Sequence, residues 1–287
     1  MSIVIQPIHA EEHYRVIEEL QRDIWGAPEI EIIPFDVLLT AQKNGGIVLG
    51  AFDLAQSPPK LIGFTFGFVG LLPGGEIKLC SHIAGVLNEY RDRNIGYRLK
   101  LAQREHMLNR GIKLITWTFD PLESRNARFN FHKLGVTCNT FLPNLYGEMR
   151  DALNAGLPSD RFQVDWHLAS ERVKDYLNGT QRKQVPSAME RAGIPLVNPP
   201  RKQAFLHPAD EFANFAALTG QLLLVQIPAN FQEIKAADFG LARAWRTHIR
   251  TLFEIAFAGG YTAVDLLVED GACFYLLETA DFNDTKQ

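Results

Sequence analysis

Residues 86–96 read Val-Leu-Asn-Glu-Tyr-Arg-Asp-Arg-Asn-Ile-Gly, and this stretch decides the fold. An apolar strand runs into a short arginine-rich turn, after which a helix opens at Gly96. The first amides of a helix lack partners within the helix and its N-terminus carries partial positive charge, so the turn offers converging donors to an anion. Full positive charges, which suit a diphosphate better than a single carboxylate, come from Arg91, Arg93 and Arg98.

The residues after this turn have the spacing of a helix followed by a strand. The helix is expected to end in a basic last turn at Arg110, with Gly111 as its cap. Residues 112–119 are rich in β-branched and aromatic side chains and predict a strand that stops before Asp120. Within the helix, the residues that recur at helical spacing and are expected to form one stripe are Tyr97, Leu99, Ala102, His106 and Leu108.

The turn resembles the acetyl-CoA signature of the GNAT N-acetyltransferase superfamily. That signature has Gln or Arg at its first position, Gly at the fourth and Gly or Ala at the sixth. Arg91 fills the first position and Gly96 the last, while Asn94 stands in place of the middle glycine. Asparagine is the side chain that best tolerates the left-handed backbone such a position usually needs.

A second segment resembles the other motif of this superfamily, N-x-x-A-x-x-x-Y-x-K-L-G-F. Residues 124–136 read Ser-Arg-Asn-Ala-Arg-Phe-Asn-Phe-His-Lys-Leu-Gly-Val. Ser124 replaces the usual asparagine, with Asn126 two places on, and Phe131 occupies the position of the usual tyrosine. The positions that match in register are Ala127, Lys133, Leu134 and Gly135.

The resemblance implies an α/β fold with a mixed sheet whose central strands splay apart, over residues 1–170. A helix is expected over residues 10–24. Strands are expected over residues 3–8, 46–52, 61–72, 76–87, 112–119, 136–141 and 161–168.

The rest of the chain predicts a connecting segment and a smaller C-terminal α/β unit. Residues 171–202 are polar and proline-rich, with one helix near residues 171–177. The unit over residues 203–287 is expected to contain strands at 221–227, 262–268 and 272–278 and a helix at 237–258. Its element order is similar to the order around Arg91, so a degenerate GNAT-like half that has lost the phosphate turn is one interpretation.

The resemblance also implies a cofactor and its site. The cofactor is acetyl-CoA or another acyl-CoA, and backbone amides near Val86 and Leu87, in the splay, would hold its pantetheine arm and polarise the thioester oxygen. The residues expected at the cofactor are Val86, Leu87, Arg91, Asp92, Arg93, Asn94, Ile95, Gly96, Tyr97, Ser124, Asn126 and Phe131.

A base is useful for such a transfer. A lysine-like amine is protonated at neutral pH, and exposing its lone pair costs about 4 to 5 kcal/mol from a pKa near 10.4. His82 is the first candidate, because its ordinary pKa is near neutrality and its strand leads to the cofactor turn. Glu76, acting through water, is the second.

Phe131 leaves the function open between two classes. In much of the family a tyrosine there protonates the departing CoA sulfur, which phenylalanine cannot do. A thiolate can leave unaided at some cost in rate, and the replacement acid could be Ser124, His132 or Tyr146. One hypothesis is an N-acyltransferase acting on a small-molecule amine. The alternative is a noncatalytic acyl-CoA-binding regulatory protein.

Composition fits a cytoplasmic enzyme. The 287 residues include 29 basic and 33 acidic side chains, a net charge of −4 that gives no reason to expect nucleic acid as a partner. Three cysteines, an odd and small number, indicate reduced thiols without a metal cluster. No export signal or membrane span is expected. The C-terminal unit could close over the acceptor or form the contact of a homodimer.

Other classes and roles are disfavoured. A nicotinamide enzyme would need a glycine-rich turn near the first strand, with an acidic residue about 20 positions later, and neither has the required spacing here. Residues 9–13 match the H-x-x-E-H pattern of one metallopeptidase class but read better as a solvated acidic helix start. A solvated or salt-bridged helix face is expected for Arg243, Arg246 and Arg250.

Overall fold

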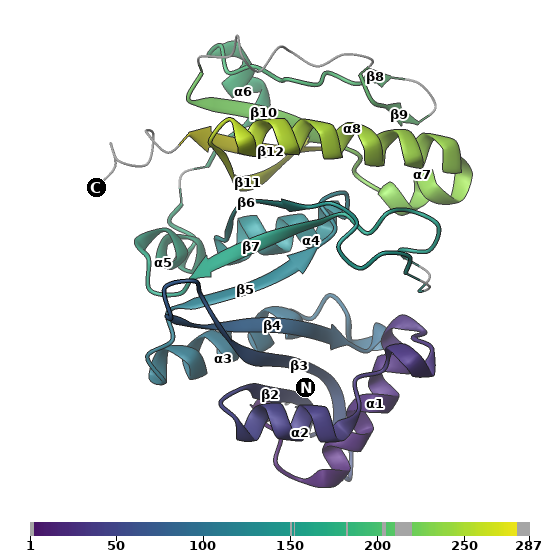
Figure 1. The fold of residues 1–287 in the computed structure, drawn as a ribbon, viewed down its shortest axis with the longest axis vertical. Helices are drawn as coiled ribbons and strands as arrows, with labels where there is room; N and C mark the ends of the chain where they lie inside the picture. The colour runs from purple at the N-terminus through teal and green to yellow at the C-terminus, as the bar shows by residue number, and fades with distance from the viewer. Residues whose placement is uncertain are drawn as a thin grey trace. The chain divides into compact units, whose positions relative to one another are not determined.

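The computed structural model describes residues 3–149, 151, 153–181, 183–202, 205–209 and 220–279. The chain packs as two units (Figure 1). The first comprises residues 1–117 and 167–169, and the second comprises residues 118–166 and 170–287. The expected division at residues 170 and 202 stays a prediction, and residues 210–219 and 280–287 of the expected C-terminal unit lie outside the described residues.

The first unit is built on five strands in sequential order. Antiparallel neighbours run from β1 through β2 and β3 to β4, whereas β5 lies parallel to β4. All five were expected, with shifts of one or two residues at their ends. Their bounds are β1 Ile3–Pro7, β2 Ile47–Asp53, β3 Lys60–Leu71, β4 Ile77–Val86 and β5 Leu114–Phe119.

Helices cover both faces of these strands. Phe64 of β3 lies against Trp25, whereas its neighbour Thr65 accepts a hydrogen bond from Gln103. Successive strand residues point to opposite faces, so the helices that carry Trp25 and Gln103 lie on opposite sides. The helices are α1 (Glu11–Trp25), α2 (Phe35–Lys43) and α3 (Ile95–Asn109), with 3₁₀ turns at Glu29–Glu31 and Asn88–Tyr90. Only α2 was not expected.

The buried face of α3 differs from the expected stripe. Tyr97, Ala102, His106 and Leu108 are only partly buried. The buried residues are Ile95, Leu99, Lys100, Gln103 and Met107, so two polar side chains occupy the middle of the face that packs on the sheet. The predicted stripe was wrong because it was drawn from the spacing of mainly apolar residues, whereas Lys100 and Gln103 are polar and are buried.

Strands β4 and β5 splay apart after a short contact. Leu79 pairs with Ile115 and Cys80 pairs with Thr116. Beyond these two pairs, Ser81 and residues 83–86 of β4 pair with β3 alone. A bulge follows directly, because Gly67 and Phe66 of β3 face Ser81 and Ile83, which leaves His82 as an extra residue. Bulges bend a strand and increase its twist, so β4 turns away from β5 at this point.

The second unit contains two similar groups of elements. The first group is the end of β5, the helical segment of α4 (Ser124–Arg128) and a π-helical turn (Phe129–Lys133), β6 (Thr137–Leu142) and β7 (Arg161–His167). The second group is β10 (Leu222–Ile227), α7 (Phe231–Ala237) with α8 (Phe239–Ala258), β11 (Tyr261–Glu269) and β12 (Ala272–Thr279). Further elements are α5 (Glu171–Asn178), α6 (Pro186–Arg191) and the short strands β8 (Arg201–Lys202) and β9 (Leu206–His207).

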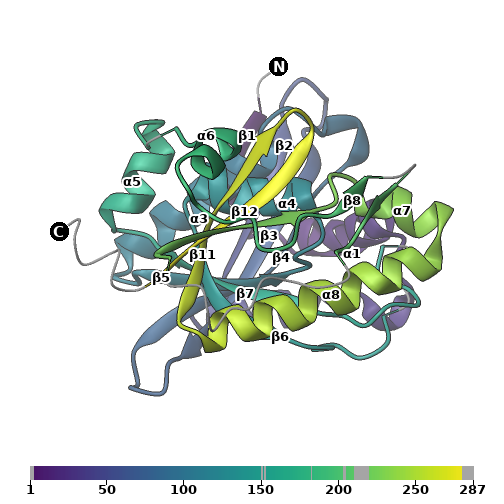
Figure 2. The same cartoon turned by 90° about the horizontal axis from the view of Figure 1, so that it is seen from above.

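The strand order makes the similarity of the two groups specific. Within the second unit the strand order is β7-β6-β11-β12-β10. In the first group the last strand, β7, lies beside β6, and in the second group the last strand, β12, lies beside β11. The two groups meet at one antiparallel bridge, Cys138 with Ala263, and α8 packs on β6 and β11 (Figures 1 and 2). The internal copy stays a prediction, and the similarity that supports it concerns the elements from β5 onward, which do not include the phosphate turn.

The helix expected over residues 237–258 is observed as α8, which begins two residues later, and α7 is an additional helix directly before it. Asp238 ends α7 in an extended conformation and its side chain accepts a hydrogen bond from the amide of Leu241, so it caps α8. The core of this unit is aromatic, with Phe162 in contact with Phe119, Phe253 and Tyr275.

Buried ion pairs attach α8 to this core. Arg246 donates both terminal nitrogens to Asp120, at 2.8 and 2.5 Å, and Arg161 lies 3.8 Å from the same carboxylate. Arg250 makes a similar pair with Asp160. The face expected to be solvated or salt-bridged is salt-bridged at Arg246 and Arg250, which are buried and half-buried, and Arg243 is exposed.

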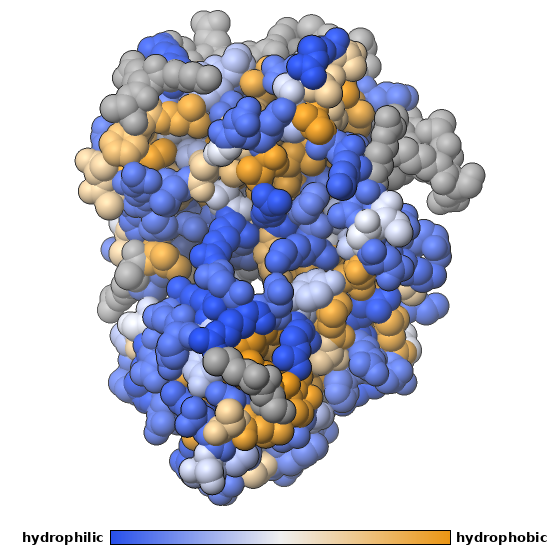
Figure 3. All heavy atoms as spheres, turned by 180° about the vertical axis from the view of Figure 1, so that it is seen from behind, coloured by the Kyte–Doolittle hydropathy of each residue, from blue (hydrophilic) through white to orange (hydrophobic). Residues whose placement is uncertain are grey.

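No helix among the described residues is long and apolar enough to cross a bilayer. On the face shown in Figure 3, hydrophilic residues separate several smaller hydrophobic groups.

Replacing Asp120 should destabilise the second unit strongly. Asp120→Ala leaves Arg246 and Arg161 buried without their carboxylate, and breaking a buried pair costs about 3–5 kcal/mol. We expect a matching loss in the free energy of unfolding measured by urea denaturation. The control is Glu171→Ala, which removes an exposed pair with Lys174 and should change little. Equal effects of the two substitutions would contradict this account.

Candidate functional site

The predicted phosphate turn is present between β4 and α3. Asn94 precedes the helix with φ 57° and ψ 19°, the left-handed conformation for which asparagine is suited, and its side chain makes no capping hydrogen bond. Asp92 is also left-handed, with φ 62°. Alternating conformations of this kind turn successive amides toward one side, the arrangement that binds anions.

Gly96 faces open space. A Cβ atom built at this position would meet no atom within 4 Å, and the backbone of Gly96 is an ordinary helical one. The chain's own packing and backbone therefore do not require glycine here. The open space leaves room for a ligand to approach the backbone of Gly96, which the predicted diphosphate site requires.

The arginines of the turn are placed differently from one another. Arg91 is exposed, and so is Arg93, whose guanidinium lies 5.0 Å from the ring centre of Tyr90. Arg98 donates to the carbonyl of Ile3 at 2.7 Å and so fastens α3 to β1. Arg91 and Arg93 are thus better placed than Arg98 to contact an anion.

Tyr90 fixes the base of the turn. Its hydroxyl donates to Asp53 of β2 at 3.0 Å, and this hydrogen bond is the main cause of its raised pKa. The Asp53 carboxylate also accepts from the amide of Ala55, which together with Tyr90 keeps its pKa low. The turn therefore has a fixed attachment to the sheet.

Only one of the two expected amide donors points into the splay. The amide of Leu87 donates to the carbonyl of Ile62 on β3 at 2.9 Å, so it is already used within the sheet. Backbone groups of a strand point alternately to its two sides, which directs the amide of Val86 away from β3. The donor role expected for both residues is therefore retained for Val86 and withdrawn for Leu87.

The two base candidates lie at different points of β4. His82 is the extra residue of the bulge, and its ring contacts Phe66 and Phe68. The His82 side chain is exposed, and the partial loss of water beside these rings lowers its pKa, so the imidazole is neutral at neutral pH. Glu76 is exposed in the β3–β4 turn, five residues before Ser81, roughly 16 Å along an extended strand. This distance does not favour Glu76 as a base.

A residue that the sequence did not reveal lies where β4 and β5 part. Lys100 of α3 is buried, with 5% of its surface exposed. Its Nζ donates to Ser81 Oγ at 2.7 Å and lies 3.8 Å from the ring centre of Trp117. Burial lowers the pKa of Lys100 to about 7. Lysine at helical spacing ordinarily indicates an exposed face, so no sequence signal could have found it.

Of the expected site residues, three lie in the second unit. Ser124 Oγ donates to the carbonyl of Ala229, and Asn126 Oδ1 accepts from Asn130. Phe131 is fully buried against Phe119 and Tyr275. Its contacts are those of a core residue, so its expected contact with a cofactor is not supported by its position.

Two expected replacement acids have partners of their own. His132 Nδ1 lies 3.2 Å from Asp265, which also accepts from the hydroxyl of Tyr176. The hydroxyl of Tyr146 lies 2.8 Å from that of Thr118. Neither contact assigns a proton-donating role.

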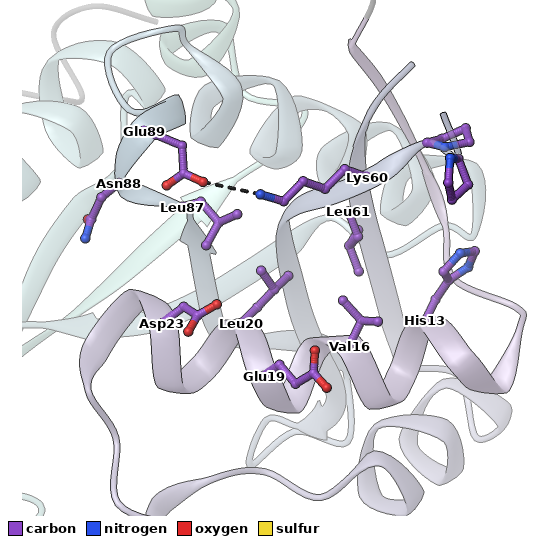
Figure 4. Close-up of a pocket in the computed structure, with 12 residues that line it drawn as sticks. His13, Val16, Glu19, Leu20, Asp23, Lys60, Leu61, Leu87, Asn88 and Glu89 are labelled. Atoms are coloured by element: carbon purple, nitrogen blue, oxygen red, sulfur yellow. Dashed lines mark hydrogen bonds and ion pairs between the residues drawn. The ribbon is translucent and has the colours of Figure 1, made fainter. Parts of the chain in front are cut away.

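A cavity of about 440 Å³ lies beside the start of the turn (Figure 4). Leu20, Leu61 and Leu87 form an apolar floor. Its polar lining is mostly acidic, with Glu19, Asp23 and a Lys60–Glu89 ion pair of 3.4 Å. Three carboxylates against one ammonium disfavour a phosphate in this cavity, so the cavity is not a candidate phosphate site.

Comparisons with known proteins found similar solved structures. No protein-family model and no curated sequence matches the chain. The NatC complex bound to Gag peptide and CoA has 16% identity and a TM-score of 0.47, over 58% of this chain and 99% of that chain. Arabidopsis thaliana NAA60 in complex with acetyl-CoA has 15% identity and a TM-score of 0.44, with the same two coverages. Aminoglycoside 6′-acetyltransferase type Ii has 18% identity and a TM-score of 0.45, again over 58% and 99%.

These solved structures are GNAT N-acetyltransferases, some of them with CoA or acetyl-CoA bound. The predicted fold class, a mixed α/β sheet with splayed central strands, is the one observed. At such identities the likeness concerns the fold alone, so roles for individual residues rest on the geometry of this chain.

Lys100→Met should raise stability at neutral pH. The pKa of Lys100 falls from 10.5 to about 7 on folding, so the unfolded chain binds more protons between these values and wild-type stability rises with pH across this window. At 1.36 kcal/mol per pKa unit, the advantage of Lys100→Met has an upper bound of roughly 4–5 kcal/mol at pH 7. It should shrink toward pH 10 in urea denaturation. A pH-independent difference would show that Lys100 is not buried as an amine.

Proposed function

We propose that the chain is an N-acyltransferase that uses acetyl-CoA or another acyl-CoA and belongs to the GNAT superfamily. One observation carries the proposal: β4 has an unpaired edge along its splay and leads directly to the phosphate turn at Gly96. A diphosphate at the turn would place the attached chain along that edge. This combination supports a long ligand with an anionic end, which is the form of an acyl-CoA.

Different residues of the first unit would bind the diphosphate, hold the pantetheine arm and accept the proton. Arg91, Arg93 and the first amides of α3 would bind the diphosphate, and the amide of Val86 would hold the pantetheine arm. When bound, the acyl-CoA supplies a thioester whose carbonyl carbon accepts an amine. His82, neutral through its lowered pKa, is the proposed proton acceptor for that amine.

The acceptor is proposed to be a small-molecule amine. Among the similar structures, NatC is bound to a peptide, whereas another is an aminoglycoside acetyltransferase, so the fold is compatible with both kinds of acceptor. The acidic cavity does not bear on this choice, because it lies beside the phosphate turn, at the end of β4 opposite the proposed reactive end. A cytoplasmic location stays a prediction.

Noncatalytic acyl-CoA binding is the second candidate function. Phe131 favours it, since the position of the usual tyrosine is given to core packing. Both candidates share the cofactor site and differ only in turnover.

Gly96→Glu should abolish cofactor binding without unfolding the protein. The new side chain enters open space, so folding is unaffected, but its charge and bulk occupy the place of the diphosphate. We expect the thermal shift given by acetyl-CoA in the wild-type protein to vanish in Gly96→Glu. Gly74→Glu is the matched control, because a Cβ at Gly74 also meets no atom within 4 Å. Retained binding in Gly96→Glu would remove the proposed site.

Turnover separates the two candidate functions. An acyltransferase should release free CoA, detected with a thiol reagent, when acetyl-CoA is mixed with a panel of amines at pH 8. His82→Gln should retain cofactor binding and lower the rate by roughly 10²-fold, the lower range for loss of a general base. Binding without release of CoA across the panel would favour the noncatalytic protein.

A further inference from the structure

Lys100 stands at the apex of the splay. The last paired residues are Cys80 of β4 and Thr116 of β5, and Lys100 Nζ contacts the residue after each of them, Ser81 and Trp117. The amine therefore fills the point at which the two strands separate. On the unpaired edge of β4, this point lies at the end opposite the phosphate turn.

The surroundings of this amine are unusual for a structural lysine. Its partners are a hydroxyl, an amide oxygen of Gln103 at 3.4 Å and an aromatic face, with no carboxylate among them. A buried amine without an ion pair is costly, and a similar-sized apolar residue would pack there with less loss. Costly buried ionisable groups concentrate at functional sites.

The proposed reaction needs a group in this place. A ligand anchored by its diphosphate at Gly96 and extended along the unpaired edge of β4 has its reactive end at the apex. The departing sulfur leaves faster when it gains a proton, and Phe131, at the position of the usual tyrosine, is buried in the core and carries no proton to give.

We propose that Lys100 is the proton donor to the departing CoA sulfur. This inference rests on the proposed acyl-CoA function and deepens it by naming the group that replaces the missing acid.

The step balances without any further reactant. The neutral acceptor amine forms a bond from nitrogen to the thioester carbon, and the carbon–sulfur bond breaks with its electron pair on sulfur. The ammonium of Lys100 transfers one proton to that sulfur and becomes an amine. His82, the proposed base, takes the surplus proton from the acceptor nitrogen, which is now bonded to the acyl group. Exchange with water then carries one proton from His82 to Lys100, which restores the neutral imidazole and the ammonium. The products are the amide and CoA thiol.

Few charged groups face Lys100. Helix α3 packs on β1 to β4, and Trp117 covers the amine from β5. Two of the charged groups on these strands have partners, Asp53 with Tyr90 and Lys60 with Glu89. Burial alone is the cause of the lowered pKa of Lys100, about 7. The titratable side chains on the packed strands and on α3 itself are Asp53, Lys60, Lys78, Cys80, His82, Tyr97, Arg98, Arg104, Glu105 and His106.

The test measures the ionisation of bound CoA rather than turnover. An ammonium beside the sulfur stabilises a thiolate, and the thiolate in turn keeps the amine protonated, so this coupled pair should form thiolate below the pKa of free CoA. We would titrate the thiolate absorbance of the CoA complex against the desulfo-CoA complex, which cancels the protein's own thiols. The variants are Lys100→Met and, as a matched control on β4, Lys78→Met.

The expected result is a thiol pKa lowered by at least one unit in the wild type and in Lys78→Met, and unlowered in Lys100→Met with CoA still bound. In turnover, Lys100→Met should lose about 10²-fold in kcat and lack the decline in rate above neutral pH, while His82→Gln keeps that decline. The same thiol pKa in wild type and Lys100→Met overturns the inference and leaves the proposed function intact. Failure of wild type to bind CoA overturns both.

Discussion

The bulge at His82 is the constraint on which the proposed site depends. Strand β4 carries one residue more than β3 at this point, which bends it just after its last pair with β5. Without the extra residue, a parallel pair would continue and close the edge of β4 with hydrogen bonds. The bend leaves that edge unpaired up to the turn, so one local irregularity both opens the splay and sets its depth.

Where β4 and β5 separate, their backbone polar groups lose strand partners, so side chains must fill the apex of the splay. Here α3 supplies Lys100, which bonds Ser81, and Gln103, which bonds Thr65 of β3 at 3.4 Å. These hydrogen bonds give buried polar groups their partners and leave a basic nitrogen in an otherwise apolar place. Packing of the helix and placement of a reactive group are therefore achieved by the same residues.

How much of this could be predicted depends on the range of the interaction involved. The turn at residues 91–96 and the bounds of α3 were predicted well, because a glycine, a left-handed asparagine and a helix start are local features. The engagement of the Leu87 amide was not predictable, because it depends on register with Ile62. Lys100 and Arg246 were assigned to no site for the same reason, since their partners Ser81 and Asp120 are distant in sequence.

The second unit explains why the phosphate turn occurs once. Its two groups of elements each repeat a strand, a helix and two further strands, and they meet at the bridge between Cys138 and Ala263. The repeated part corresponds to the half of the fold that begins at β5, after the turn and α3. The similarity therefore gives no place to a second turn, because the elements that recur begin after the first one. The Asp120–Arg246 pair joins the two groups, with the carboxylate after β5 and the guanidinium on α8. This pair gives the C-terminal elements a structural role that does not require a second cofactor.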